Sequence, residues 1–503
     1  MFTPSSLLRV VTGQIMTWRG DSLILVYIHG HSDCEIENNL GTRHLQTLLM
    51  FLGMTLGYCQ RVGMSVAIVP MINASTANPD FEDYKWDNTE KSLALSSFFW
   101  GYTVAQVPSG YVAGIWSAQM LLSVGMLLCG IFNVITPFVT HRWNLVAVCV
   151  CRVGMGLTQG CLLPCVHTLL SKWAPPPERA RLGTFAYAGA QFGTVIALPI
   201  SGALAASAGG WPSIFYLFGA LAILWSVCFF LLGADSPFKH RSISQEEKEY
   251  IEESLRTTER KEDPKVKQKL RTPWREIFTS WPMWAIILAH CGQNWGYWTL
   301  LTEMPTYMKK VLNFNIEGSG GYSALPYLAM WILSFPVSWL SDFALEKGAS
   351  RGLVRKLSNT MAFWGPAIAL ACMSVIPRNN STYALALLIV AVGLNAGSLC
   401  GFQVNHIDLS PNYAGTMMSI TNCIASVVAI LAPLICDQII ITDETNVHQW
   451  NNVFYVSAAI YFLGNLAFVI FSKGEVQWWN DPDEVEARRQ KRRRKNDMIE
   501  TQT

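Results

Sequence analysis

Charged side chains are scarce in this sequence. Only 14% of its 503 residues are Asp, Glu, Lys or Arg, whereas a soluble protein usually carries about 25%. Those that are present gather between long apolar runs, and 51% of all residues are hydrophobic. This pattern excludes a large soluble core and indicates a protein embedded in a lipid bilayer. The net charge of +2 gives no reason to expect a nucleic acid as a partner.

Motifs of catalysis and metal binding are also lacking. We find no phosphate-binding Walker loop and no nucleophile elbow. Gly154 and Gly156 lie inside an apolar run, where helix packing explains them better than nucleotide binding. Cys161, Cys165 and His167 have no clear fourth ligand, so metal binding is not expected there. We therefore predict a protein that is not an enzyme and that holds no metal or organic cofactor.

Long apolar runs are what the sequence does contain. Each is near the roughly 20 residues that a bilayer-spanning helix needs. A polar segment from Asp235 to Arg275 divides them into six and six. We predict an all-α membrane protein with twelve transmembrane helices in two six-helix halves. The runs begin near Leu45, Leu93, Gln119, Leu145, Gly183, Pro212, Trp281, Gly321, Leu357, Tyr383, Tyr413 and Asn452. The predicted segments are an N-terminal tail at 1–42, the first half at 43–234, a linker at 235–276, the second half at 277–473 and a basic tail at 474–503.

Lys and Arg in the short loops predict the orientation of the chain. Lys172, Arg179 and Arg181 fall on the same side as the polar linker and the basic tail, so this side and both termini should be cytoplasmic. The first loop on the other side is acidic and carries Asn73 in an Asn-Ala-Ser sequon, a candidate glycosylation site. Six plus six helices around a cytoplasmic linker are typical of a transporter whose halves rock about a site near the midplane.

Two arginines lie within the apolar runs, Arg61 in the first and Arg152 in the fourth. An ionisable group in the bilayer is costly and usually faces a cavity or a partner. Counting 1.5 Å per residue, both arginines lie roughly 5 to 8 Å from the midpoints of their helices, displaced outward. Two guanidinium groups at similar depth could grip a carboxylate or a phosphate bidentately. The alternative for each is a structural pair, or a side chain that reaches to the interface.

Neutral polar side chains accompany the two arginines. Their amide and hydroxyl groups suit an oxygen-rich solute or a sodium ion, although each could equally bond one helix to another. Those near the arginines or in the middle of later runs are Gln60, Gln159, Gln293, Asn294, Tyr297 and Asn422. Toward the cytoplasmic end of the tenth run, His406 and Asp408 could form a gate or a proton relay, or simply a helix-terminus contact.

Six stretches resemble a known family in the same order along the chain. They are Arg61–Pro70, Ser96–Pro108, Ser171–Arg179, Gly210–Tyr216, Pro305–Met308 and Val404–Gly415. Together they resemble the anion:cation symporter family of the major facilitator superfamily, which includes sialin, the vesicular glutamate transporters and sodium–phosphate cotransporter-like proteins. The resemblance covers roughly residues 43 to 480. In the phrase Gly156–Gly160 the sequence most resembles the insect-type inorganic phosphate cotransporters.

The resemblance implies the fold of that superfamily and a contact of Arg61 and Arg152 with an anionic substrate. The sequence departs from the family at three positions. Proton-coupled members carry a glutamate where this chain has Gln159, and some members have an acid at Gln60. Vesicular glutamate transporters have an arginine at Gln293. Without these groups, we expect coupling to sodium or to the membrane potential rather than to protons.

The loops that follow the second and eighth runs also differ from each other. The segment from Gly114 to Gln119 has none of the basic residues usual in this superfamily, whereas Asp342 is retained in the matching loop of the second half. We expect Asp342 to take part in gating on the cytoplasmic side.

Three functions remain open from the sequence. The first is a sodium-coupled symporter of inorganic phosphate or a related anion, working by alternating access as a monomer. The second is a carrier of sugar acids or acidic amino acids in an organelle. The third is an anion channel or a polytopic receptor. No lysosomal address is evident in residues 1–42, so we expect the plasma membrane rather than the lysosome or the synaptic vesicle.

Overall fold

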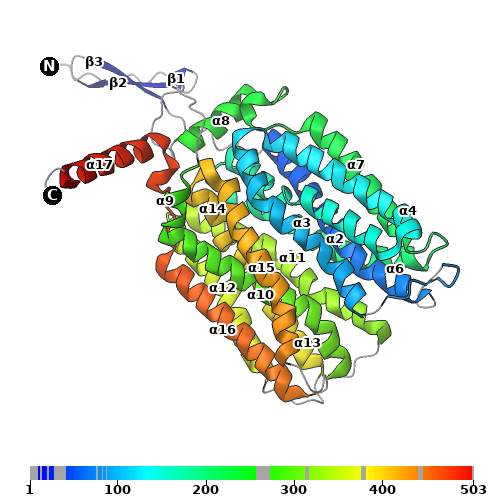
Figure 1. The fold of residues 1–503 in the computed structure, drawn as a ribbon. Helices are drawn as coiled ribbons and strands as arrows, with labels where there is room; N and C mark the ends of the chain where they lie inside the picture. The colour runs from blue at the N-terminus through cyan, green and yellow to red at the C-terminus, as the bar shows by residue number, and fades with distance from the viewer. Residues whose placement is uncertain are drawn as a thin grey trace.

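The computed structural model shows a bundle of long helices with a small sheet at one end (Figure 1). It describes residues 10–11, 14–19, 22–27, 41–74, 78–81, 83–86, 88–256, 272–311, 316–374, 381–439 and 446–500. The sheet consists of β1 (Val10–Val11), β2 (Gln14–Arg19) and β3 (Ser22–Tyr27), paired antiparallel in that order with Ile15 opposite Val26. The sequence analysis did not predict this sheet.

The first half contains six membrane spans. They are formed by α2 (Thr42–Ile72), α3 (Asn88–Ile115), α4 (Ala118–Gln159) continued by α5 (Leu162–Trp173), α6 (Arg179–Ala206) and α7 (Pro212–Leu232). Helix α4 contributes two spans because its backbone breaks at Asn144, which has a positive φ of 51°. Asn tolerates positive φ better than most residues, and its side-chain oxygen accepts a 2.6 Å hydrogen bond from the Trp86 indole.

The second half repeats this number of spans. They are α10 (Trp281–Lys310), α11 (Ile316–Glu346), α12 (Arg351–Met373), α13 (Ser381–Leu394) continued by η3 (Leu399–Gln403) and α14 (Val404–Leu409), α15 (Ala414–Ile439) and α16 (Val447–Phe471). The predicted architecture of twelve membrane helices is confirmed. The span through α13 and α14 is irregular, because η3 is a π-type turn in which Gly401 leaves the helical region (φ −82°, ψ −115°). Such turns are frequent at functional sites.

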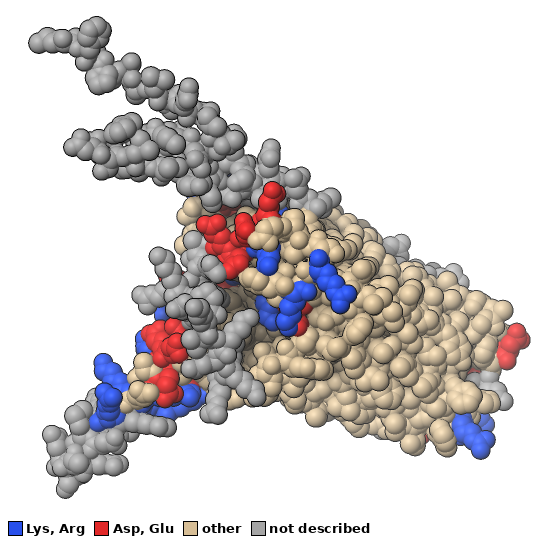
Figure 2. Space-filling model, turned by 90° about the horizontal axis from the view of Figure 1, so that it is seen from above, with Lys and Arg blue, Asp and Glu red and all other residues tan. Residues whose placement is uncertain are grey.

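Length and composition alone identify seven segments of the described residues as membrane spans, one of which holds both spans of α4 and α5. The less apolar spans include α2, α3 and α10, which carry the polar groups of the site described below. Figure 2 shows a broad belt of uncharged surface, with Lys, Arg, Asp and Glu gathered mainly toward one end. Such a belt fits a protein surrounded by lipid.

The amino-terminal sheet, the linker helix α8 and the carboxyl-terminal helix α17 lie at the same end of the bundle, which we call the linker end (Figure 1). The linker helix α8 (Gln245–Arg256) docks onto the first half through Glu247, whose carboxylate accepts hydrogen bonds from the backbone N–H groups of Thr42 and Arg43 at 2.8 and 3.0 Å. Arg43 also pairs with Glu178 at 2.8 Å. The first turn of α2 is therefore capped by a residue from the linker.

A different pair of helices is tied together beside the second half. Helix α17 (Pro482–Glu500) is joined to the short α9 (Trp274–Phe278) by an ion pair between Arg489 and Glu276, 2.8 Å apart. Each end of the linker is thus anchored to its own partner, α8 to the first half and α9 to the carboxyl-terminal helix.

Glycine allows α3 and α4 to touch backbone to backbone. A Cβ at Gly156 would clash with the carbonyl oxygen of Phe98, and a Cβ at Gly101 with the carbonyl oxygen of Val153. The close approach explains why Gly156 lies in an apolar run, in agreement with the packing interpretation. At the same contact between α3 and α4, the ring of Phe98 packs against the guanidinium of Arg152.

Candidate functional site

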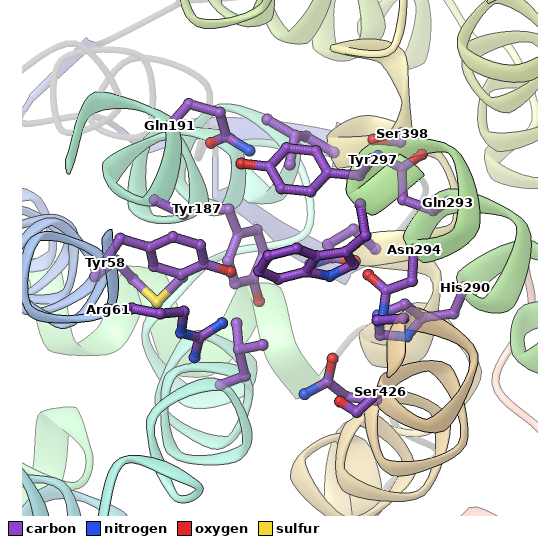
Figure 3. A pocket seen from close by; sticks show the side chains of 18 of the residues that line it. Tyr58, Arg61, Tyr187, Gln191, His290, Gln293, Asn294, Tyr297, Ser398 and Ser426 are labelled. Atoms are coloured by element: carbon purple, nitrogen blue, oxygen red, sulfur yellow. The ribbon is translucent and has the colours of Figure 1, made fainter. Parts of the chain in front are cut away.

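A cavity of about 90 Å³ lies between the two halves of the bundle. Since a water molecule needs roughly 10 to 15 Å³ of such space, the cavity has room for several waters or one small ion. The first half lines it from α2, α3, α5 and α6, and the second half lines it from α10, α11, α15 and the irregular span around η3. Figure 3 shows Tyr58 and Arg61 on one side of this pocket, facing His290 and Asn294 on the other.

Arg61 supplies the positive charge of the pocket wall. Its side chain is only 8% exposed. Its Nη2 donates a 3.0 Å hydrogen bond to the side-chain oxygen of Gln159, and its Nε has no hydrogen-bond partner. Its guanidinium carbon lies 4.6 to 4.8 Å from the ring centres of Tyr58, Phe98 and Tyr102. No carboxylate of the described residues forms an ion pair with it.

The energetics of Arg61 favour an anion beside it. Each cation–π contact contributes about 0.5 to 2 kcal/mol, whereas burying a charge costs several kcal/mol after relaxation. The aromatic rings therefore offset only part of the cost, and an anion in the pocket would offset more. Arg61 lines the cavity, and a guanidinium can hold a carboxylate or phosphate oxygen.

Arg152 lies behind the pocket rather than on its wall. It is 2% exposed and is not among the residues that line the cavity. Its guanidinium carbon is 4.9 Å from the centre of the Phe98 ring, on which Arg61 also packs. Its Nε and Nη1 have no hydrogen-bond partner. In this conformation, Phe98 separates the second predicted anion ligand from the pocket.

The two glutamines near the arginines have different surroundings. Gln159 accepts the bond from Arg61 and donates one to the Gly57 carbonyl at 2.9 Å, so it positions the guanidinium without lining the cavity. Gln60 lies inside the first half, where its side-chain oxygen accepts a 3.0 Å contact from the Cys129 thiol. The structure thus places Gln60 away from the pocket, while Gln159 acts on the pocket through Arg61.

Neutral side chains form the wall of the second half. Gln293, Asn294 and Tyr297 on α10 line the pocket together with Asn422 on α15, as their polarity in apolar runs suggested. The amide of Gln293 bonds to the side-chain oxygen of Asn395, and its own oxygen has no partner. Asn422 donates a 3.0 Å hydrogen bond to the hydroxyl of Tyr102 on α3, which joins the halves across the pocket.

His406 and Asp408, for which the sequence left a gate, a proton relay or a helix-terminus contact open, have different partners in the structure. Asp408 accepts from Arg179 of the first half at 3.2 Å and from Arg355 of the second half at 2.7 Å, and all three side chains are 1% exposed. His406 contacts the Gln403 carbonyl and the Thr421 hydroxyl. Residues two apart on a helix point in different directions, which is why the pair does not form.

Asp342 joins the halves at the linker end. Its carboxylate accepts a 2.7 Å hydrogen bond from the backbone N–H of Arg181 and pairs with that guanidinium at 3.3 Å. Together with the Arg179–Asp408–Arg355 cluster, it closes this end of the bundle between α6 and the second half. In the first half, Gln119 instead donates its backbone N–H to Asp235 at the start of the linker, at 3.0 Å.

The sequence analysis did not predict several of the residues that line the pocket, although helical spacing indicates some of them. Tyr58 precedes Arg61 by three positions, and His290 precedes Gln293 by three, so each shares a helix face with a residue that was noticed. The predicted glycosylation site lies elsewhere. Asn73 is exposed just after α2, and the Ser75 of its sequon lies outside the described residues.

A two-half bundle with a cavity between the halves is the geometry of a rocking transporter, and comparison with known proteins decides the family. The family model of the Major Facilitator Superfamily matches residues 50–433. The chain belongs to the major facilitator superfamily. A solved structure of that superfamily, the proton:xylose symporter XylE, covers 86% of this chain and 98% of its own with a TM-score of 0.64. At 15% sequence identity, this likeness supports the fold alone.

Relatives within the superfamily are more informative. A Drosophila melanogaster protein named "Putative inorganic phosphate cotransporter" is 37% identical over 94% of this chain and 92% of its own length. Human sialin is 36% identical over 87% and 90%, respectively. Human vesicular glutamate transporter 2 is 34% identical over 89% and 76%. The family resemblance read from the sequence is confirmed, and this superfamily member is a multi-pass membrane transporter and not an enzyme.

Proposed function

We propose that this superfamily member is a secondary active transporter of a small anion, with inorganic phosphate as the first candidate. The observation that carries the proposal is Arg61, a buried guanidinium on the wall of a cavity between the halves with no carboxylate partner among the described residues. The modest volume of the cavity favours a small anion. The name of the Drosophila relative agrees with this choice.

The mechanism that fits this site is alternating access. The anion binds between Arg61 and the amides of α10, and the halves then rock around it. Opening toward the linker end requires Arg179 to leave Asp408 and Arg181 to leave Asp342, because these are ion pairs between the halves. Each half otherwise moves with its own packing intact.

Sodium is our proposed coupling cation. Gln159 stands where the resemblance places a glutamate in proton-coupled members, and Gln60 stands where some members carry an acid, so this chain lacks both acidic groups. We also propose that the protein works as a monomer in the plasma membrane and carries a glycan on Asn73. Surface biotinylation tests the location in the plasma membrane, and the mobility shift after glycosidase treatment tests the glycan.

The deciding experiment measures uptake of labelled phosphate by cells that express the full chain, in sodium medium and in choline medium. We expect saturable uptake that falls in choline and is lost in Arg61→Gln. The matched control is Arg142→Gln, which removes an exposed arginine from the same half. Saturable uptake that survives unchanged in Arg61→Gln would place the anion site elsewhere.

A carrier of organic anions is the second candidate, because sialin and a vesicular glutamate transporter are among the relatives. A wild-type protein that carries sialic acid or glutamate but no phosphate would establish it. Flux that does not saturate with concentration would indicate a channel instead.

A further inference from the structure

Three buried histidines lie beside the pocket and take no part in the function proposed above. They are His167 on α5 (0% exposed), His290 on α10 (4%) and His406 on α14 (0%). The ring centre of His406 is 5.4 Å from that of His167 and 6.3 Å from that of His290. His167 belongs to the first half and the other two to the second, so the cluster crosses the boundary that moves during transport.

Hydrogen bonds connect the three rings into one chain. The Gln403 carbonyl faces His167 Nε2 at 3.2 Å and His406 Nδ1 at 3.0 Å. The Thr421 hydroxyl faces His406 Nε2 at 2.9 Å and His290 Nδ1 at 3.0 Å. Two ends of the chain reach the cavity, since His290 lines it and so does Tyr187, whose hydroxyl lies 3.0 Å from His167 Nδ1. Figure 3 shows Tyr187 and His290 among the pocket side chains.

The partners determine where the hydrogens lie in the neutral cluster. A carbonyl oxygen only accepts, so His167 Nε2 and His406 Nδ1 must both be N–H donors to Gln403. A neutral imidazole has a single N–H, and His406 Nε2 must then accept the hydrogen of the Thr421 hydroxyl. The hydroxyl oxygen in turn accepts from His290 Nδ1. In this arrangement His167 Nδ1 carries no hydrogen, so it accepts from the Tyr187 hydroxyl, and its 3.2 Å contact with the Leu163 carbonyl is not a hydrogen bond.

One more proton fits the cluster without moving any heavy atom. A proton from pocket water adds to the unprotonated Nε2 of His290, and the Nδ1 proton of His290 passes to the Thr421 oxygen. The hydroxyl proton passes on to His406 Nε2, which becomes an imidazolium. The Thr421 hydroxyl then donates to His290 Nδ1 and accepts from His406 Nε2, the reverse of the neutral arrangement. One proton enters, and the only bonds made or broken are the N–H and O–H bonds named here.

We propose that His167, His290 and His406, joined by Thr421 and the Gln403 carbonyl, form a proton-binding site whose occupancy is linked to anion binding. The link to the anion rests on the proposed function. The proton site itself does not, and it can operate with or without a sodium gradient. The mechanism thereby gains a titratable group that the glutamines at positions 60 and 159 do not provide.

The surrounding charges explain why the anion and the proton should bind together. Tyr187 from α6 contacts the cluster, and α15 contributes the neutral Thr421 and Met418. Asp408, two residues beyond His406 on α14, points away from that ring and is held by Arg179 from α6 and Arg355 from α12. Two arginines against one aspartate leave a net positive charge, and Arg61 adds another across the pocket. An imidazolium is therefore opposed while the pocket is empty and favoured once an anion is bound, and the reciprocal effect strengthens anion binding.

The test uses the full chain in proteoliposomes that contain a pH-sensitive dye, with labelled phosphate as the probe and sodium held constant. We expect phosphate to carry protons inward and its uptake to change about fivefold or more between pH 5.5 and 7.5, the lower end of typical coupling. His406→Gln and Thr421→Val should lose the proton entry and flatten the pH profile. His141→Gln, at an exposed position, should keep both. A wild-type pH profile with full proton entry in both cluster variants would overturn the proposal.

A second measurement does not depend on transport. Full-length protein with ¹³C-labelled histidine, in detergent micelles, should show ring signals that titrate together and disappear in Thr421→Val or His406→Gln. Adding phosphate should move the midpoint of this titration to higher pH. A wild-type protein that carries no phosphate would refute the substrate and leave this titration to decide the proton site. Cluster signals that never titrate between pH 4 and 9 would refute the site.

Discussion

The pocket and the linker end both contain buried arginines, but their partners differ. At the linker end, Arg179 and Arg355 share the carboxylate of Asp408. In and behind the pocket, Arg61 and Arg152 have no ion pair with any described carboxylate and pack on aromatic rings instead. The comparison teaches that the paired arginines join helices through a shared carboxylate, whereas Arg61 is left with its charge beside the cavity, which is the basis of our proposal that an anion binds there.

The largest loss of stability should follow from a substitution among the paired arginines and carboxylates at the linker end. Asp408→Asn removes the charge shared by two buried arginines, and breaking a buried pair in this way costs about 3 to 5 kcal/mol. We expect a strong loss of thermal stability in detergent, or a population shifted to the state that is open at the linker end. Asp342→Asn is the milder comparison, because its partner Arg181 is 39% exposed. Equal effects of the two variants would refute the ranking.

Arg61→Gln should affect phosphate binding strongly and the stability of the empty protein little, which is the reverse of Asp408→Asn. The empty protein should lose little stability, because Arg61 has no carboxylate partner to leave behind. The stabilisation by phosphate, about 2.7 kcal/mol at a hundred times the dissociation constant, should vanish. Melting curves with and without phosphate measure both quantities. A phosphate-induced rise in melting temperature equal to that of wild type would contradict the assigned role.

Arg152→Gln should have a smaller effect on the anion, because Phe98 stands between Arg152 and the pocket. We expect phosphate binding to weaken by no more than about tenfold, which corresponds to 1.4 kcal/mol. A loss as complete as that of Arg61→Gln would mean that Phe98 moves aside and both arginines hold the anion. In that case Phe98→Leu would show whether the anion reaches Arg152 past the Phe98 ring or whether Arg152 acts on the pocket indirectly.

The smallest effect is the pH dependence of the ion pair between Arg489 and Glu276, which lies outside the membrane spans. The hydrogen bond from Arg489 is the main reason why the pKa of Glu276 lies below its ordinary value of 4.5. A depressed pKa means that the stabilisation is present above pH 4.5 and is lost as the pH falls through the folded-state pKa. We expect α17 to gain amide hydrogen exchange only below pH 4.5, the ordinary pKa of this carboxyl group. In Arg489→Gln, exchange should be higher at neutral pH as well.

The sequence predicted the bundle well because a bilayer imposes long apolar runs. The runs starting at Gln119 and Leu145 located the break at Asn144 within one residue. Helices such as α2 begin a few residues before the apolar run, at Thr42 rather than Leu45, since their first turns carry polar groups. The amino-terminal sheet could not be anticipated from the hydropathy of the membrane runs.

The pocket was predicted in part. Arg61, Gln293, Asn294, Tyr297 and Asn422 all line it, because a polar side chain in the middle of an apolar run has few other places to point. The position of Arg152 could not be derived, because it depends on how α4 is rotated against α3 and on the ring of Phe98 between them.

The cap that Glu247 places on the first turn of α2 has a consequence for biosynthesis. The carboxylate and the Thr42 N–H that it holds are separated by 205 residues. At a synthesis rate of about 5 to 20 residues per second, the ribosome needs roughly 10 to 40 seconds to cover that distance. The helix that carries Arg61 therefore enters the membrane first but acquires its finished end only after the sixth span and α8 have been made.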